Sequence, residues 1–591
     1  MAVKTDMMYE FYRFPEGAVK SGTPISIYLK IMRRAALSPY FCTENERLPM
    51  KWISFEKGFD LYKLIFTPET GLYFFNFKTN NTELSGGQIT VYDKNFKTPD
   101  WIYGGLIYHI IVDRFCRSGD TPIRGDVIFH ENKDDTPLFL PDENGIVKNN
   151  DFFGGNLKGI EERLDYLSSL GVTAIYLSPI FKSYSNHKYD TGNYFEIDPM
   201  FGTESDLVSL CNEAKRHGIR IILDGVFSHT GDDSVYFNKY GNYDSVGAYQ
   251  SDLSPYRSWY NIRSRNDYDC WWGISTLPTV NKNDPTYIEF IRNVLVYWQQ
   301  RGISSWRLDV ADELTDPMLD NIRDAAKAKN PESIIIGEVW EDASNKTSYG
   351  KRRHYLLGNQ LDSVMNYPLR EGIINFVKYS NAESLKTCIE TLMTNYPPPV
   401  INCLMNILGT HDTARILTIF GTDKTFSSKT EMAEFSLSKE EYSLAVKRLK
   451  AASFLQFFLP GVPSIYYGDE VGMEGLIDPF NRKFYPWGKE NEEILSHYKK
   501  ISEFRKKTEI FKDGLYKTEY ATGGVFIFTR YDEKDNLTFA TNVSSSPHLL
   551  FTRIYDMLNG EYTDTLNPYG FVIYKTPQER TLNEQKGFKI T

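Results

Sequence analysis

Closely spaced cysteine pairs are missing from this sequence. Its six cysteines lie far apart and form no C-x-x-C motif; they are Cys42, Cys116, Cys211, Cys270, Cys388 and Cys403. This spacing argues against a zinc site and against a disulfide framework, so we expect reduced structural thiols. A Walker phosphate loop and an H-E-x-x-H helix are missing as well, so two common signatures of nucleotide-dependent and metal-dependent enzymes do not apply.

Positive charge and long apolar runs are also scarce. The chain has 67 Lys and Arg against 77 Asp and Glu, a formal net charge of −10, and it contains no basic cluster. A nucleic acid or an anionic membrane as the main partner would call for such a cluster, whereas a neutral substrate would not. No apolar run is long enough to cross a bilayer, and the first residues contain no apolar signal core. We therefore expect a cytoplasmic protein that binds neither nucleic acid nor membrane.

The 591 residues are too many for one ordinary hydrophobic core, and the apolar pattern changes twice along the chain. Short alternating runs separated by Gly, Pro and Asn turns fill residues 1–100, a pattern typical of a β-sandwich. The same pattern returns in residues 510–591. Between them, residues 101–509 show apolar runs that alternate with amphipathic helices. We therefore predict a central domain of alternating strands and helices between an N-terminal and a C-terminal β-sandwich.

Eight strand candidates can be counted in the central region: 106–112, 172–177, 219–223, 304–308, 333–336, 361–365, 406–408 and 464–467. Helices are predicted between them, including 158–170, 204–217, 286–301 and 316–329. Eight alternations of strand and helix indicate an α/β fold, the (β/α)₈ TIM barrel. The longest insertion, about residues 229–284, follows the third strand and is predicted as an inserted domain that carries function.

The fourth strand candidate ends in a charged pair, Arg307 and Asp309. Residues two apart on a strand face the same way, so the cation would keep the carboxylate ionised and oriented. An isolated pair of this kind can equally be a solvated ion pair. Three further strands also end in reactive side chains, which are Asp224 and His229 after the third, Glu338 after the fifth, and His411 and Asp412 after the seventh. Because strand ends of a barrel meet at one mouth, we expect these side chains to share a pocket.

Two facing carboxylates are what glycoside hydrolysis requires, one ionised as the nucleophile and one protonated as the acid. Asp309 is the candidate nucleophile because Arg307 favours its ionised form. Glu338 is the candidate acid and base, because its apolar neighbours in sequence would favour the protonated form. Asp412 is the candidate third carboxylate, which would grip sugar hydroxyls and orient the ring.

On these residues the chain resembles the α-amylase family of glycoside hydrolases over residues 104–509. Four motifs occur in the family's order, which are Asp224 to His229, Arg307-Leu308-Asp309, Glu338, and His411-Asp412. The resemblance implies that Asp309 is the nucleophile, Glu338 the acid and base, and Asp412 the stabiliser of the transition state. The substrate-binding residues that it implies are His187, Tyr189, Asp224, His229, Arg307, Trp340, His411, Asp478 and Arg482.

Further segments are similar to those of neopullulanases, cyclomaltodextrinases and maltogenic amylases. Residues 186–190, with His187 and Tyr189, look like the loop whose Tyr stacks on the sugar at the cleavage site and whose His contacts its hydroxyls. Residues 478–482 look like the segment that reaches the non-reducing side of the substrate, and 277–281 like the family's fifth motif. The N-terminal sandwich resembles the starch-binding-like β-domain of that subgroup, which often builds homodimers.

Several positions depart from the family's pattern. Ser228 stands where many members have an Asn that helps to hold calcium, and Glu313 fits the oligosaccharide-preferring subgroup. The segment that corresponds to a second calcium loop has Arg124 where an acidic ligand is expected, which leaves Asp120 and Asn156 as candidate oxygen ligands for a structural calcium. We expect no cofactor in the chemistry and no metal among the catalytic residues.

The sequence therefore predicts a retaining glycosidase that cuts α-1,4-glucosidic bonds of maltooligosaccharides, cyclodextrins, pullulan or starch through a glycosyl–Asp309 intermediate. The nearest alternative is an enzyme with the same site that transfers sugars or cleaves α-1,6 bonds. A third hypothesis is a non-catalytic glucan-binding homologue, against which the presence of all three carboxylates argues.

Overall fold

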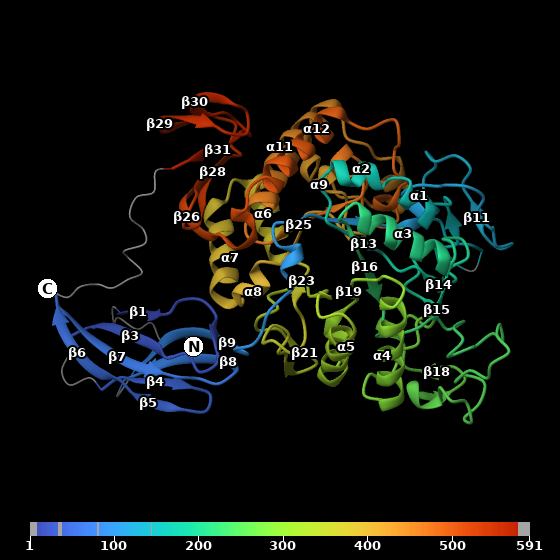
Figure 1. The fold of residues 1–591 in the computed structure, drawn as a ribbon, viewed down its shortest axis with the longest axis horizontal. Helices are drawn as coiled ribbons and strands as arrows, with labels where there is room; N and C mark the ends of the chain where they lie inside the picture. Colours follow the sequence, from blue (N-terminus) through green and yellow to red (C-terminus); the bar gives the residue numbers. More distant parts are fainter. Residues whose placement is uncertain (1–8, 34–37, 80–81, 144, 577–591) are drawn as a thin grey trace. The chain divides into compact units, whose positions relative to one another are not determined.

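The computed structural model describes residues 9–33, 38–79, 82–143 and 145–576 (Figure 1). These residues form two compact units. The first contains the described residues up to Thr98 together with Glu341–Ser363 and Ile389–Ile401. The second contains Pro99–Trp340, Val364–Cys388 and the described residues from Asn402 onward.

The first unit is built around a β-sandwich. One sheet has the strand order β1 (Tyr9–Phe14), β3 (Ile25–Met32), β7 (Phe59–Phe66) and β6 (Lys51–Glu56). The other has the order β2 (Val19–Lys20), β9 (Glu83–Tyr92), β8 (Gly71–Lys78), β4 (Tyr40–Thr43) and β5 (Arg47–Pro49). Strand β3 shows why they form layers: its alternate residues, from Ile25 to Ile31, are fully buried, and the residues between them are half-buried.

The second unit contains an eight-stranded parallel sheet except for one residue, Ser363 of β23. In chain order the strands are β10 (Ile107–Ile110), β13 (Ala174–Leu177), β16 (Arg220–Gly225), β19 (Ser305–Leu308), β20 (Ile335–Gly337), β23 (Ser363–Val364), β24 (Met405–Ile407) and β25 (Val462–Tyr466). They are neighbours in this order, β25 pairs with β10, and a bridge between Met365 and Met405 closes the ring. Every strand overlaps one predicted from the sequence, so the predicted (β/α)₈ barrel is confirmed.

Helices connect the strands, and their ends are marked in the sequence. Helix α3 (Glu204–Arg216) begins with a capping box made by Thr203 and Asp206, and α4 (Pro285–Gln299) is capped by Asp284. The remaining helices of four or more residues in the described chain are α5 (Asp316–Lys329), α6 (Tyr367–Tyr379), α7 (Ala382–Asn395), α8 (Pro398–Ile401), α9 (Ile416–Gly421), α10 (Lys429–Glu434), α11 (Lys439–Phe458), α12 (Glu492–Lys506) and α13 (Ile510–Asp513), besides the two described next.

The helix predicted over 158–170 is divided in the structure. It consists of α1 (Leu157–Glu161) and α2 (Leu164–Ser169), and Arg163 between them has a non-helical backbone. The Arg163 guanidinium lies 4.0 Å from the centre of the Trp487 ring, so a tertiary contact holds this residue where the local pattern alone would continue the helix.

The connection from β16 to α4 is the long segment expected after the third strand. Its regular structure is short: the strands β17 (Ile262–Ser264) and β18 (Asp267–Tyr268) and two single 3₁₀ turns. Aromatic rings supply its interior, such as Phe237, which packs on Tyr260 and Tyr268 at 5.0 and 4.9 Å between ring centres.

The chain after the barrel returns to antiparallel strands. A four-stranded sheet has the order β26 (Leu515–Thr522), β27 (Val525–Tyr531), β28 (Asn536–Asn542) and β31 (Phe571–Lys575), and β29 (His548–Asp556) pairs with β30 (Glu561–Leu566). Val525, Ala540, Leu566 and Val572 form their common core. The β-rich regions predicted before and after the barrel in the chain are thus confirmed.

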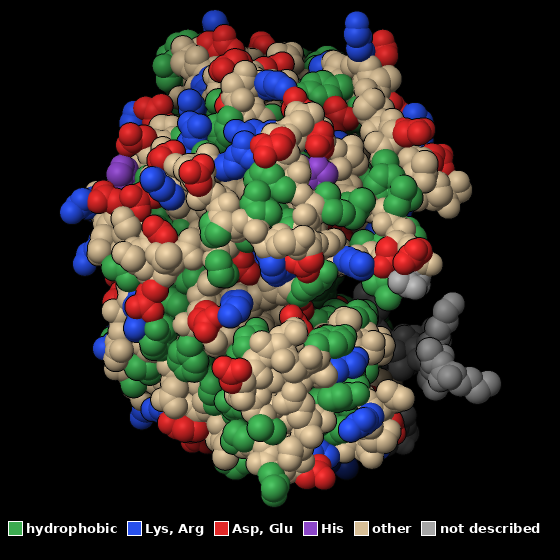
Figure 2. Space-filling view, turned by 90° about the vertical axis from the view of Figure 1, so that its right-hand side faces the viewer, with side chains coloured by type: hydrophobic (Ala, Val, Ile, Leu, Met, Phe, Trp, Pro, Cys, Tyr) green, Lys and Arg blue, Asp and Glu red, His purple; other side chains and the backbone are tan. Residues whose placement is uncertain are grey.

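Charges of both signs are intermingled on the face drawn in Figure 2. None of the helices in the described part of the chain combines the length and the apolar content that crossing a bilayer requires.

A buried arginine joins the start of the barrel to its end. Arg505 of α12 donates to the carbonyl oxygens of Gly104 and Gly105 before β10, at 3.1 and 3.2 Å, and to that of Gly461 before β25 at 2.7 Å. It also donates to the carbonyl oxygen of Phe457. Replacing it would leave these carbonyls without a donor.

We expect Arg505→Met to lower the free energy of unfolding by about 3 kcal/mol, because unpaired buried carbonyls cost about 1–3 kcal/mol each and partly relax. Chemical denaturation followed by circular dichroism measures this change. The control is Lys506→Met at the exposed neighbouring position, which should change stability by less than about 0.5 kcal/mol. Equal stabilities of the two variants would contradict the structural role of Arg505.

Candidate active site

Four barrel strands deliver the predicted residues to one end of the sheet. Asp224 is the penultimate residue of β16, and Asp309 directly follows β19. Glu338 directly follows β20, and His411 and Asp412 follow β24 after a short turn. Since the strands are parallel, these residues lie at the same, carboxyl-terminal, mouth of the barrel.

Arg307 is the centre of this group, and its side chain is fully buried. Its Nη1 lies 2.8 and 3.0 Å from the two carboxylate oxygens of Asp224 and 2.9 Å from Oδ1 of Asp309. Its Nη2 lies 2.7 Å from Oε2 of Glu338. One guanidinium therefore binds carboxylates from three neighbouring strands.

The protonation of Asp309 depends on more than Arg307. Burial raises the pKa of Asp309 well above its ordinary value of 3.8, the Arg307 guanidinium opposes this shift, and the charges of Glu338 and Asp224 add to it. Burial raises the pKa of Asp224 as well, again opposed by Arg307. The sequence predicted only the lowering effect of the arginine. The structure adds burial and crowding of like charges, which together favour retention of a proton within the group.

Glu338 is surrounded by donors instead of the apolar neighbours that the sequence suggested. The backbone N–H of Val310 donates to Oε2 at 2.9 Å, and the indole N–H of Trp340 donates to Oε1 at 3.1 Å. Val310 has φ 37° and ψ 62°, a left-handed conformation that is strained for a β-branched residue. The left-handed turn at Val310 thus directs its N–H toward Glu338. Because Val310 directly follows Asp309, this hydrogen bond links the backbone next to Asp309 to the Glu338 carboxylate.

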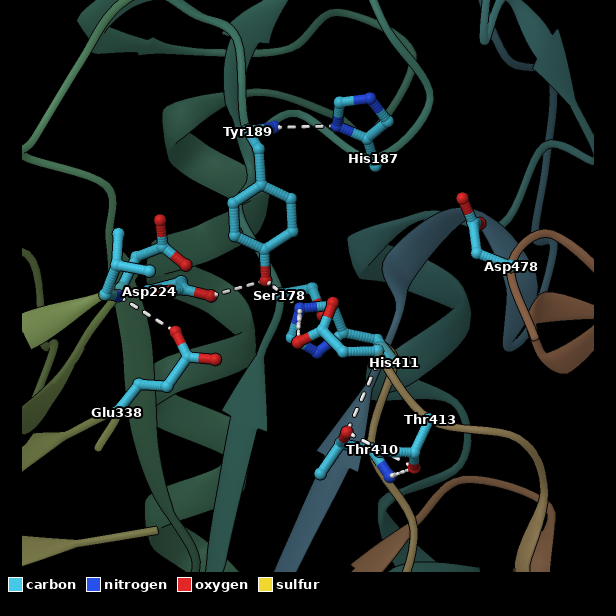
Figure 3. Close-up of polar contacts among 12 residues, drawn as sticks. Ser178, His187, Tyr189, Asp224, Glu338, Thr410, His411, Thr413 and Asp478 are labelled. Atoms are coloured by element: carbon cyan, nitrogen blue, oxygen red, sulfur yellow. Dashed lines mark hydrogen bonds and ion pairs between the residues drawn. The ribbon is translucent and has the colours of Figure 1, made fainter. Parts of the chain in front are cut away.

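Tyr189 lies beside Asp224 and His411 (Figure 3). Its hydroxyl donates to Oδ2 of Asp224 at 3.0 Å and lies 2.6 Å from Nε2 of His411, and the Tyr189 and His411 rings stack at 5.2 Å with 9° between their planes. Because the hydroxyl hydrogen goes to Asp224, Nε2 of His411 carries the proton between these two residues. Nε2 also lies 3.2 Å from Oδ2 of Asp412.

His187 and His229 hold the loop that carries Tyr189. Nδ1 of His187 accepts a hydrogen bond from the backbone N–H of Tyr189 at 3.1 Å (Figure 3). Nε2 of His229 lies 3.1 Å from the Tyr189 carbonyl oxygen. Ser228 Oγ lies 2.9 Å from Nδ1 of His229 and so fixes that ring. Burial lowers the pKa of His229 to about 3 and also lowers that of His187, so both are neutral near pH 7.

Arg482 and Asp478 lie on the other side of His411. Nη1 of Arg482 is 3.0 Å from Oδ1 of Asp478, its Nη2 is 3.7 Å from Oδ1 of Asp412, and its Nε donates to the His411 carbonyl oxygen at 3.0 Å. The side chain of Asp412 is 32% exposed, more than that of Asp309 at 10%. The structure therefore brings all the residues predicted for the site to one place.

Three buried residues of the site were not predicted from the sequence. Tyr176 of β13 donates its hydroxyl to Asp224 at 2.6 Å. Asn481 donates to the carbonyl oxygen of His411 at 2.7 Å, and Arg114 donates to that of Arg482 at 2.8 Å. Tyr176 belongs to a strand that is buried on both faces, so its sequence does not reveal which side chain faces the barrel interior.

The candidate calcium ligands have other contacts. Oδ1 of Asn156 accepts the N–H of Gly159 at 2.8 Å as the cap of α1, and its Nδ2 donates to the Ser118 carbonyl oxygen at 2.7 Å. Asp120 is exposed. Within residues 9–576, apart from the gaps named above, no group of three or more His, Cys, Asp or Glu side chains is placed to hold a metal ion.

We expect Arg307→Met to lower the free energy of unfolding by about 3–5 kcal/mol, the scale for breaking a buried charge network. Without the cation, the folded-state pKa values of Asp224 and Asp309 stay above their unfolded values. The stability they contribute is then present below pH 3.8 and lost as the pH rises through the raised values. Stability measured from pH 4 to 8 should therefore fall more steeply in this variant than in the wild type. Arg216→Met, at an exposed position, is the control.

The chain is similar to known proteins over most of its length. The alpha-amylase family profile, described as the alpha amylase catalytic domain, matches residues 109–486. An amylopullulanase from Thermoanaerobacter thermohydrosulfuricus is 39% identical over 505 residues, which are 77% of this chain and 33% of that protein. A cyclomaltodextrinase from Geobacillus thermopakistaniensis is 32% identical and aligns with 81% of this chain and 78% of its own length.

A solved structure supports the same relation. The type III pullulan hydrolase from Thermococcus kodakarensis superposes with a TM-score of 0.70 at 26% identity, over 95% of this chain and 98% of that one. The chain spans between 33% and 46% of the length of the amylopullulanases it matches. The family match covers more than half of the sequence, and the chain therefore belongs to the alpha-amylase family, whose catalytic domain it carries.

Proposed function

We propose that this chain is a retaining glycoside hydrolase that cleaves α-1,4-glucosidic bonds in maltooligosaccharides, cyclodextrins, pullulan or starch. The observation that carries this proposal is the Arg307 guanidinium, which contacts Asp309 through Nη1 and Glu338 through Nη2. Two carboxylates that share one guanidinium lie close together. This favours the separation of about 5–5.5 Å found in retaining enzymes over the 6.5–9.5 Å or so of inverting ones.

In the first step, Asp309 attacks the anomeric carbon and a covalent glycosyl–Asp309 ester forms. Glu338 gives its proton to the glycosidic oxygen, so the sugar on the leaving side departs as an alcohol. In the second step, Glu338 takes a proton from water, the water oxygen attacks the anomeric carbon, and the bond to Asp309 breaks. Both inversions together retain the configuration. This chemistry requires no cofactor.

The other residues of the site have supporting roles in this mechanism. The Tyr189 ring offers an apolar face to the sugar at the cleavage point, and its position is fixed by His411 on one side and Asp224 on the other. Asp412 is the more exposed carboxylate, so it is available to sugar hydroxyls and to the positive charge that develops on the ring. His187, His229 and Arg482 position these groups.

The names of the relatives support glucans as substrates, because they include amylopullulanases, cyclomaltodextrinases and a pullulan hydrolase. An enzyme that transfers sugars or cleaves α-1,6 bonds would use the same residues. A cyclic α-maltosyl-(1→6)-maltose hydrolase from Arthrobacter globiformis, with a TM-score of 0.68 at 26% identity, favours including this alternative. Digestion of pullulan distinguishes α-1,6 cleavage from α-1,4 cleavage, since the first gives maltotriose and the second gives panose or isopanose.

We expect Asp309→Asn and Glu338→Gln to fold normally and to lose about 10³-fold or more of kcat/KM on maltooligosaccharides. Both changes keep the shape of the side chain, but Asn cannot act as the carboxylate nucleophile and Gln cannot give or take the proton. The control is Asp252→Asn, whose side chain is 89% exposed and which should keep full activity. Either site variant with near-normal turnover would refute the assignment.

Nuclear magnetic resonance of the first product should show the α-anomer, and a β-anomer would refute retention.

The pH profile provides a further test. Burial raises the pKa of Asp309 well above 3.8, so the nucleophile is protonated, and activity is lost, as the pH falls through that raised value. We therefore expect the acid limb of kcat/KM to lie above pH 3.8, the ordinary pKa of an Asp carboxyl. Circular dichroism at each pH would show that the enzyme is still folded there. An acid limb at or below pH 3.8 in a folded enzyme would contradict the raised pKa.

A further inference from the structure

Two adjacent tryptophans form a stacked pair in the inserted segment between β18 and α4. The rings of Trp271 and Trp272 lie 5.2 Å apart between centres, with 17° between their planes. Trp272 is 80% exposed, although indole is among the side chains with the most to gain from burial. The mechanism proposed above does not use either residue.

The backbone at this point is strained and firmly held. Trp272 has φ 48° and ψ 30°, a left-handed conformation that a bulky residue rarely adopts. The N–H of Trp271 donates to the carbonyl oxygen of Leu277 at 2.9 Å, which closes the turn. The turn is tied to the segment after β16 by Asp232 N–H to Thr276 O at 2.9 Å and Thr230 N–H to Pro278 O at 3.1 Å. Strain that is held in this way is typical of binding sites.

The pair is continuous with the active site. The Trp271 ring lies 5.4 Å from the His229 ring, and Nε2 of His229 lies 3.1 Å from the carbonyl oxygen of Tyr189. A row of rings and contacts therefore leads from the sugar-facing Tyr189, through His229 and Trp271, to the exposed face of Trp272.

The contact with His229, which follows β16, places the Trp271 ring near the end of that strand. Arg482 follows β25 and Arg114 follows β10, and they line a small hollow together with Tyr189 and His411. The tryptophans belong to the connection after β16, and Glu313 follows β19. In the closed order of eight strands, β16 lies opposite β24, β19 lies opposite β25, and β20 lies opposite β10. Glu338, the proton donor to the leaving sugar, follows β20 and thus lies on the tryptophan side; Figure 3 shows Glu338 and Asp478 on opposite sides of Tyr189.

We propose that the Trp271–Trp272 pair is a platform for glucose rings on the leaving-group side of the cleft, which is also the side where an acceptor sugar would bind. This inference rests on the proposed function and adds a binding residue to it. The exposed indole face of Trp272 packs on the C–H face of a glucose unit, and Trp271 keeps that face in place. Lys282 and Glu313, an ion pair at 4.0 Å on the same side, supply polar partners for its hydroxyls.

Two substrates separate this platform from the catalytic residues. α-Maltosyl fluoride has sugar only on the donor side and releases fluoride, so it does not extend to Trp272. Maltopentaose has enough glucose units to occupy both sides. We expect Trp272→Ala to lower kcat/KM for maltopentaose about tenfold, the scale of one lost stacking contact. Turnover of α-maltosyl fluoride should be unchanged, and transfer of the maltosyl group to added glucose should decrease.

Trp272→Phe keeps an aromatic face and should restore most of the lost activity. Leu253→Ala is the matched control, since Leu253 is 94% exposed in the same inserted segment, and it should change neither rate. Equal losses on both substrates would assign Trp272 a structural role, and unchanged rates on both would also overturn the inference while leaving the proposed function intact. Wild-type protein that does not turn over α-maltosyl fluoride would overturn the proposed function itself.

Discussion

A single buried cation is the interaction on which the site depends. Removing a guanidinium from water costs several kcal/mol, and this cost is offset only when carboxylates lie close to it. Arg307 finds them in Asp224, Asp309 and Glu338, which come from three adjacent strands. The contacts require these strands to be in register, and the register in turn aligns the strand ends. The same register of strands that forms the barrel therefore also sets the positions of its carboxylates.

The second feature of the site is a loop that is held rigid by neutral histidines. His187 and His229 bind the backbone of Tyr189 from its N–H and its carbonyl side, and His411 stacks on its ring. Burial lowers the pKa of each of these histidines, so they serve as hydrogen-bonding groups without adding positive charge. Positive charge at the carboxylates then comes from Arg307 and Arg482, whose positions are fixed.

Much of this arrangement could be predicted because strand ends in a barrel always converge. A polar residue directly after an apolar run, repeated on four strands, was enough to bring Asp224, Asp309, Glu338 and Asp412 together. The surroundings of Glu338 could not be predicted, since one of its donors is the N–H of Val310 in a left-handed conformation. Backbone conformations of this kind depend on packing. Valine rarely adopts them, so the sequence gives no sign of one at position 310.

The sequence by itself determined the class of fold, the order of the strands and the identity of the reactive side chains, because hydrophobic periodicity and the residues after each run are local properties. Tertiary structure alone decided that Tyr176 reaches Asp224, that burial raises the pKa of Asp309, and that the indole of Trp272 is exposed beside Trp271. Each of these depends on groups far apart in the chain, whose distance and solvent exposure exist only once the barrel has closed.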